Sequence, residues 1–352
     1  MIRRPPRSTL SPSSAASDVY KRQTRRYIKM ARIYFATDVH GSNKVWRKWI
    51  NVPNSIEKVD VLVLAGDLTG KSIVPIIDRG DKWTARIFGR TWELKTKEEV
   101  QELMQKIAES GYYPMEMTPQ EVQELQNDPK KLDRLFEKVM TQRMEEWLTM
   151  ALEKVPENIE IIVMPGNDDE FCIDPVIQKF EKESGGRIIY PLGKAIELNN
   201  LPGYQIISFD YVNPTPWNTP REDNEKGLWK RLEKLVDLVT MDWNRVLANF
   251  HCPPHGTRLD LAPKLDKNLK PVYVLGEQIR EHVGSKSVRK FIEKYQPLMG
   301  LHGHIHESYA ADKIGRTIII NPGSEYVEGI LRGFIIDIDP QKGLERWWKV
   351  EG

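Results

Sequence analysis

The sequence is poor in cysteine, in long apolar runs and in net charge, and each shortage excludes a class of protein. Only two cysteines, Cys172 and Cys252, occur in 352 residues, and their spacing fits neither a zinc site nor a redox motif. Such a content is typical of a reducing compartment, so we expect a cytoplasmic protein rather than a disulfide scaffold. No apolar run approaches the ~20 residues of a membrane helix, and we expect no membrane partner.

The formal net charge of +2 conceals an uneven distribution along the chain. Residues 1–29 contain eight basic residues and one acidic residue, whereas the chain from Met30 onward contains 44 basic and 49 acidic residues. The larger part of the chain is therefore mildly acidic. This balance does not favour a nucleic-acid polyanion as the main partner.

Residues 1–29 also differ from the rest of the chain in composition. They are rich in Arg and Ser, as organelle transit peptides are, but they lack an amphipathic period. They resemble translated adaptor sequence joined to an open reading frame, and Met30 is followed directly by a strand-like segment. We expect residues 1–29 to be a non-native leader without a functional role, and residues 30–352 to form a single domain.

From Met30 onward, short apolar runs alternate with helical stretches, which predicts an α/β protein. The runs are rich in β-branched residues and bounded by turn residues, as is typical of buried strands. They comprise residues 33–36, 61–64, 161–164, 206–209, 246–250, 318–320 and 334–336.

A helical insert at about residues 71–158 is predicted between the second and third runs. Residues 131–155 place apolar side chains at helical spacing, and Thr118 begins a capping box with Pro119 at the first helical position. The insert either pads the fold or forms a cap that walls a substrate pocket. The sequence favours neither alternative.

Polar clusters built from Asp, Asn and His follow four of these apolar runs and a fifth apolar run at residues 297–301. Because ligands in open α/β sheets gather at the carboxyl ends of strands, we expect the clusters to converge at one edge. Five such clusters are hard to explain as helix caps or core histidines. They are Asp38-Val39-His40, Gly66-Asp67, Gly166-Asn167-Asp168-Asp169, His251-Cys252-Pro253-Pro254-His255 and His302-Gly303-His304-Ile305-His306.

The side chains in these clusters indicate a metal site. A mixed set of Asp, His and Asn without thiolate suits Mn, Fe, Zn, Co or Ni and does not suit a cysteine-rich structural zinc. About seven candidate ligands are too many for one ion. They fit two divalent ions roughly 3.5–4 Å apart that share a carboxylate.

In their residues and in their order, the five clusters resemble the five motifs of the calcineurin-like metallophosphoesterases, and the resemblance runs from about Met30 to the end of the chain. Gly284-Ser285 before the last histidine motif and Asn321-Pro322-Gly323-Ser324 after it agree with the resemblance. The family implies a four-layer αββα sandwich with a dinuclear site at one edge.

The resemblance also implies roles for individual residues. Asp38, His40 and His306 would hold the first metal, Asp67 would bridge, and Asn167, His251 and His304 would complete the second site. With manganese as the favoured metal, a hydroxide shared by the two ions would attack phosphorus in line, on a small-molecule phosphoester substrate. The motifs specify neither the group beyond the phosphorus nor an oligomeric state.

One position departs from the family pattern. Many members have a histidine after the Gly-Asn pair that can protonate the leaving group, whereas this chain has Asp168. A carboxylate beside a dication is a poor acid near neutral pH, which argues against efficient cleavage of alkyl monoesters. Members of the family that lack this histidine are often phosphodiesterases, so the resemblance implies a phosphodiesterase rather than a phosphomonoesterase. His255 and His302 are the alternative acids, although a loop role for His255 and support of a metal ligand by His302 are favoured.

Two rival functions remain at this point. Residues 65–72 match a relaxed phosphate-binding loop after a strand, which would make the chain a nucleotide hydrolase but would account for none of the histidines. The fold can also serve as a non-catalytic scaffold for partner binding. Scaffolds of this kind usually lose metal ligands, and every mapped position here keeps one.

Overall fold

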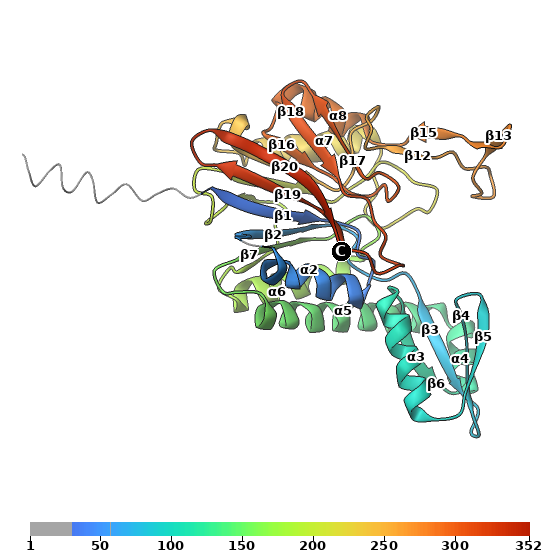
Figure 1. The fold of residues 1–352 in the computed structure, drawn as a ribbon. Coiled ribbons are helices and arrows are strands. Elements are labelled where there is room, and N and C mark those ends of the chain that lie inside the picture. Colours follow the sequence, from blue (N-terminus) through green and yellow to red (C-terminus); the bar gives the residue numbers. More distant parts are fainter. Residues whose placement is uncertain (1–29, 57) are drawn as a thin grey trace, which may run out of the picture.

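Two six-stranded sheets lie face to face at the centre of the protein, with helices on both outer faces (Figure 1). The computed structural model describes residues 30–56 and 58–352, so the expected leader at residues 1–29 lies outside the described residues. The first sheet has, in order, β20 (Gly343–Glu351), β19 (Arg332–Asp339), β1 (Ala31–Ala36), β2 (Val61–Ala65), β7 (Glu160–Met164) and β8 (Ile188–Ile189). The second has, in order, β17 (Ala310–Ile314), β18 (Thr317–Asn321), β16 (Met299–Leu301), β11 (Val246–Phe250), β10 (Gln205–Phe209) and β9 (Ala195–Glu197).

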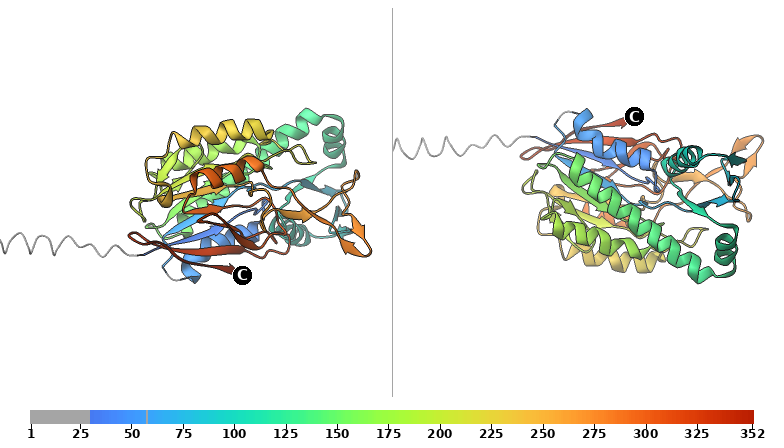
Figure 2. Two further views of the ribbon diagram at one scale, coloured as in Figure 1. Left: turned by 90° about the horizontal axis from the view of Figure 1, so that it is seen from above. Right: turned by 90° about the horizontal axis from the view of Figure 1, so that it is seen from below.

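Helices cover the outer face of each sheet and complete the four-layer αββα sandwich that was predicted. In Figure 2, the view from below shows the long helix α5 lying across one outer face, and the view from above shows α7 and α8 on the other outer face. The first sheet carries α2 (Asn43–Ser55), α5 (Pro129–Lys154) and α6 (Asp174–Glu183), and the second carries α7 (Glu225–Val236) and α8 (Lys286–Tyr295). The sandwich also contains two short 3-10 helices, η1 (Phe171–Ile173) and η2 (Trp243–Arg245).

The alternation of side chains along each strand builds two cores at once. Along β1, Ile33 and Phe35 point into the core between the sheets, whereas Tyr34 and Ala36 pack against the helices. Strands buried on both faces need continuous apolar runs, which is why these segments were recognisable in the sequence. All seven predicted runs form strands.

Parallel pairing brings the functional loops to one edge. In the first sheet, β1, β2 and β7 run parallel, and in the second β10, β11, β16 and β18 do so. The polar clusters follow β1, β2, β7, β11 and β16. The predicted convergence at the carboxyl ends of the strands therefore has a direct cause in the topology.

The segment at residues 71–158 is not purely helical, which corrects the sequence prediction. It contains a four-stranded sheet packed against a helix with an apolar core of its own, and it lies beside the sandwich (Figure 1). Its strands were missed because Pro75 interrupts the first of them and their side chains are mostly half exposed. The elements are β3 (Ile73–Asp78), β4 (Trp83–Ile87), β5 (Arg90–Leu94), α3 (Lys97–Glu109), β6 (Tyr113–Met117) and α4 (Pro119–Asn127).

Helix α5 joins this insert to the sandwich. Its predicted apolar face is buried only from Met140 onward, where Met144 and Trp147 pack under the first sheet. Leu132, near its start, is 41% exposed. A second projection is an arm made of β12 (Leu261–Pro263), β13 (Tyr273–Val274), β14 (Glu277–Gln278) and β15 (Arg280–His282).

Among residues 30–56 and 58–352, the structure contains no helix with the length and apolarity needed to cross a membrane. Both cysteines are free thiols.

A buried carboxylate in the first sheet leads to a prediction about acid stability. Asp337 on β19 accepts hydrogen bonds from Arg32 Nε and Nη2 at 2.7 and 2.9 Å and from Arg346 Nε at 2.7 Å. Burial alone would raise the pKa of Asp337, but the two arginines outweigh it and lower the pKa. A lowered pKa in the folded state stabilises the protein above the unfolded value of about 3.9, and this stabilisation is lost as the pH falls.

We expect Asp337→Asn to lower the free energy of unfolding by about 1.5–3 kcal/mol at pH 7, the range for hydrogen bonds to charged groups. The difference from the wild type should shrink below about pH 4, because the wild-type carboxylate is then protonated as well. Urea unfolding between pH 7 and pH 3 measures it, with the exposed Glu345→Gln as control. A difference that stays constant over this range would contradict the prediction.

Candidate metal centre

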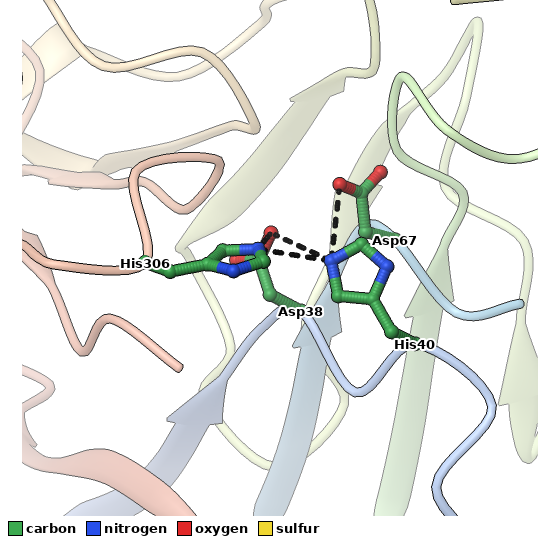
Figure 3. A group of neighbouring side chains, drawn as sticks. All are labelled: Asp38, His40, Asp67 and His306. Atoms are coloured by element: carbon green, nitrogen blue, oxygen red, sulfur yellow. Dashed lines mark hydrogen bonds and ion pairs between the residues drawn. The ribbon is translucent and has the colours of Figure 1, made fainter. Parts of the chain in front are cut away.

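Two groups of histidine and carboxylate side chains meet at the edge of the sandwich. Within each group, one potential ligand atom per residue lies within 4.8 Å of the others. Figure 3 shows the side chains of the first group pointing toward one another from different loops. The first group is Asp38, His40, Asp67 and His306, and the second is Asp67, His251 and His304.

The polar atoms of the first group lie close to one another. His40 Nε2 lies 2.9 Å from His306 Nε2 and 3.6 Å from Asp67 Oδ2. His306 Nε2 lies 3.4 Å from Asp38 Oδ1. Ligands of one ion at about 2.1 Å from the metal are themselves roughly 3.0–3.4 Å apart, so these atoms are spaced as the donors of one site are.

Asp67 also belongs to the second group, through its other oxygen. Its Oδ1 lies 3.4 Å from His251 Nε2, and Asn167 Oδ1 lies 3.0 Å from the same nitrogen. The rings of His251 and His304 are 5.5 Å apart. The structure therefore brings together all seven residues that the resemblance implied as ligands, with Asp67 between the two groups.

The backbone of the site is strained in a consistent way. Asp38, His40, Asp67 and His304 have φ angles of 54°, 40°, 48° and 69°, in the left-handed region that residues with a side chain rarely adopt. Such strain costs on the order of 1–3 kcal/mol per residue and persists only where the surroundings impose it. Gly66 is required here, since a Cβ at this position would lie 2.2 Å from His251 Nδ1.

Hydrogen bonds from outside the two groups orient the side chains. His251 Nδ1 bonds to the carbonyl of Ala65 at 2.9 Å, which leaves Nε2 facing the second group. The Thr37 hydroxyl donates to Asp38 Oδ2 at 2.6 Å. Ser324, from the predicted supporting motif, donates its hydroxyl to the Asp38 carbonyl at 2.6 Å.

Asp169 fixes the loop that carries Asp67. Its fully buried carboxylate accepts bonds of 2.7–3.1 Å from the backbone of Leu68, Thr69 and Gly166 and from the Thr69 hydroxyl. Asp169 thus ties the loop after β2 to the loop after β7.

Arg221 holds the loop after β7 from behind. It is 1% exposed and donates to Asp210 and Asp174, both at 2.8 Å, and to the Asp169 carbonyl at 2.9 Å. Removing one partner from such a buried network leaves uncompensated charge.

Charge within the cluster is divided unevenly. Burial raises the pKa of Asp38, but the neighbouring histidines, His251 first, outweigh it and hold that pKa below its ordinary value. Burial opposes a proton on His251, yet Asp67 and Asp38 raise the pKa of His251 to about 10. Burial, and then His251, lower the pKa of His304 to about 4. Asp67 and Asp38 thus favour positive charge on His251, whereas His304 is kept neutral.

The donor set fits divalent transition metals. Carboxylate oxygens, imidazole nitrogens and one amide oxygen form a hard-to-borderline set, and no thiolate takes part. The side chains are mostly buried, and the Nε2 atoms of His40, His251 and His306 all face other members of the two groups or Asn167. Buried charges normally pair or coordinate metals, so metal binding accounts for the arrangement.

Asp168 lies at the rim of the site beside a lysine. Lys71 Nζ is 2.6 Å from Asp168 Oδ2, which in turn lies 3.8 Å from His40 Nδ1. The ring of Tyr326 covers the same side, 4.7 Å from the His40 ring and 5.9 Å from the His306 ring. Neither Lys71 nor Tyr326 was among the predicted metal ligands or acids, although Lys71 follows Asp67 by four residues and Tyr326 follows Ser324 by two.

The two alternative acids lie outside both groups. His302 is fully buried, and its Nδ1 bonds to the carbonyls of Phe250 and Cys252 at 2.8 and 3.0 Å. His255 Nδ1 lies 3.6 Å from the buried Asp260 Oδ2. These contacts favour the supporting and loop roles over the acid role.

The rival prediction of a phosphate-binding loop at residues 65–72 is wrong. Such a loop leads directly into a helix, whose N-terminus holds the phosphates. Here the chain continues into the strand β3, and the lysine of the motif pairs with Asp168.

Comparisons with known proteins find similar folds among solved structures and one relative by sequence. No protein-family model matches the chain. An uncharacterized protein of Methanocaldococcus jannaschii is 33% identical over 173 residues, which are 49% of this chain and 67% of that protein. One crystal structure shares the fold at a TM-score of 0.54 and 14% identity, covering 92% of this chain and 99% of its own. A novel archaeal phosphodiesterase reaches a TM-score of 0.34 at 12% identity, over 91% and 99% of the chains, which is too distant to bear on function.

The position of Asp67 predicts how metal content responds to mutation. Asp67→Ala should abolish binding of both ions, because each group loses a carboxylate oxygen, whereas Asp38→Ala should chiefly empty the first site. Elemental analysis after manganese loading counts the ions per chain, with the exposed Asp237→Ala as control. Two ions retained in Asp67→Ala, or none in the well-folded wild type, would contradict the assignment.

Proposed function

The chain belongs to the same family as the uncharacterized Methanocaldococcus jannaschii protein, and we propose that it is a metal-dependent phosphoesterase that prefers phosphodiesters to phosphomonoesters. The observation that carries the proposal is the carboxylate of Asp67, whose two oxygens face two separate groups of ligands at 3.6 and 3.4 Å. A shared carboxylate between two sites is the arrangement that two-metal hydrolysis requires.

Asp38, His40 and His306 would hold one ion and Asn167, His251 and His304 the other, with manganese favoured. When bound, two divalent ions would supply an activated water and neutralise the phosphoryl oxygens. The positive φ angles and the bonds from Thr37 and Ser324 fix the ligands before substrate arrives, which reduces the reorganisation that binding requires.

Lys71 and Asp168 set the electrostatics at the rim. Lys71 is about half exposed, so its ammonium group can contact a phosphoryl oxygen of a bound ester. Asp168 adds a negative charge on the same side, which opposes a dianionic monoester more than a monoanionic diester. Because Lys71 already pairs with its carboxylate, Asp168 is also poorly placed to donate a proton to a leaving oxygen.

The proposal is tested with bis(4-nitrophenyl) phosphate and 4-nitrophenyl phosphate after manganese loading. We expect a higher kcat/KM for the diester, loss of activity with chelator, and recovery when manganese is restored. Protein that binds two ions but hydrolyses neither ester, nor any of a panel of nucleotides and cyclic nucleotides, would instead be a non-catalytic scaffold.

The residue at position 168 should control the dependence on the leaving group. Without an acid, rates of the wild type should fall steeply as the pKa of the leaving group rises, and Asp168→His should raise the turnover of alkyl monoesters. General acid catalysis typically contributes about 10²–10⁴-fold to a rate. The turnover of alkyl monoesters should therefore rise at least about tenfold and at most about 10⁴-fold.

A series of aryl and alkyl phosphates measures kcat/KM for the wild type and Asp168→His, with Asp237→His as a control far from the site. Equal slopes in the two proteins, together with fast turnover of alkyl monoesters by the wild type, would mean that another residue supplies the proton.

A further inference from the structure

An open groove of about 640 Å³ lies between the insert and the sandwich. This volume is within the range of pockets that hold small molecules. The insert contributes Phe88, Arg90, Trp92 and Lys106, and the sandwich contributes Lys44 and Val327. We call these six residues the insert groove.

Three cations in the insert groove lack an anionic partner. Lys44, Arg90 and Lys106 form no ion pair with any residue in the described part of the chain. Of the two acids at its edge, Glu109 is already paired with an arginine at 2.8 Å, so only Glu328 opposes the three cations. Unpaired cations that converge on a concave surface attract an anionic group.

Aromatic side chains lie beside these cations. The Arg90 guanidinium carbon is 3.5 Å from the centre of the Trp92 ring, and Lys106 Nζ is 6.0 Å from the same ring. Phe88 is 45% exposed in the turn between β4 and β5, at a φ of 54°. Phe88 and Gly89 form the two-residue turn of this hairpin, where positive φ angles are usual, and the turn leaves the Phe88 ring exposed at the groove. Aromatic rings next to cations suit a ligand with both a flat ring and an anion.

One short loop connects the insert groove to the metal centre. Ser324 bonds to the Asp38 and His306 carbonyls at 2.6 and 3.0 Å, and the ring of Tyr326 lies 4.7 Å from His40. The next residue, Val327, lines the groove. From these contacts and the 3.8 Å between successive Cα atoms, the groove begins within roughly 12 Å of the His40 ring.

We propose that the insert groove binds the part of the substrate beyond the phosphorus, and that this part carries a flat aromatic ring and a second anionic group. A short oligonucleotide such as a 5′-phosphorylated dinucleotide has this chemistry. The inference rests on the proposed function for its hydrolytic meaning, whereas the binding itself needs no catalysis.

Binding is measured first, by titration calorimetry with 5′-phosphorylated diadenylate in the presence of chelator. The substitutions Trp92→Leu and Lys106→Gln, the latter at an exposed side chain, should each raise the dissociation constant about tenfold. This is the scale of one lost stacking contact with a base or one lost contact with a phosphate. Trp83→Leu and Lys95→Gln, on the same insert but outside the groove, are the matched controls. Unchanged affinity in both groove variants would overturn the inference.

Selectivity is measured second, as the ratio of kcat/KM for the dinucleotide to that for bis(4-nitrophenyl) phosphate. The ratio should fall about tenfold in Trp92→Leu and Lys106→Gln through a higher KM for the dinucleotide, and stay constant in the controls. Binding without hydrolysis of either ester would refute the proposed function and leave the groove assignment intact. Hydrolysis of both esters at a ratio of kcat/KM values that no groove variant changes would support the proposed function and refute the groove assignment.

Discussion

The carboxylate of Asp67 is the constraint on which the rest of the site depends. Its two oxygens face different groups at 3.6 and 3.4 Å, so a small displacement takes one of them out of reach. The residue holds this place in a left-handed conformation that costs on the order of 1–3 kcal/mol. Next to Asp67, the backbone N–H groups of Leu68 and Thr69 donate buried hydrogen bonds to Asp169 in the neighbouring loop, and these bonds, each contributing about 1 kcal/mol, offset that strain.

The site also requires both sheets to be packed against each other. Asp38 and Asp67 follow strands of the first sheet, whereas His251 and His304 follow strands of the second. The apolar core between the sheets is therefore what keeps the two halves of each ligand group in contact. Stability of the sandwich and integrity of the centre are two aspects of one packing arrangement.

The metal centre could be predicted well from the sequence, because each of its ligand clusters lies next to a recognisable strand in the chain. Each buried strand is an apolar run, and each cluster follows its strand directly, so both the strands and the seven converging residues could be predicted. The insert sheet could not, because half-exposed strands interrupted by Pro75 lack a clear apolar period. Lys71 and Tyr326 were missed because their role depends on contacts across the fold with Asp168 and His40.

Lys71, at the start of the insert, connects the insert to the rim of the metal centre through Asp168. The insert joins the sandwich where Gly70 and Gly111 pass His40, and a Cβ on Gly111 would lie 2.3 Å from the His40 carbonyl. Backbones this close leave no room for the insert to move without moving a proposed ligand. Lys71 follows Gly70 directly and reaches the rim of the centre. The junction of the insert with the sandwich and the backbone position of His40 are therefore set by the same contacts, so a displacement of the insert would also displace this predicted ligand.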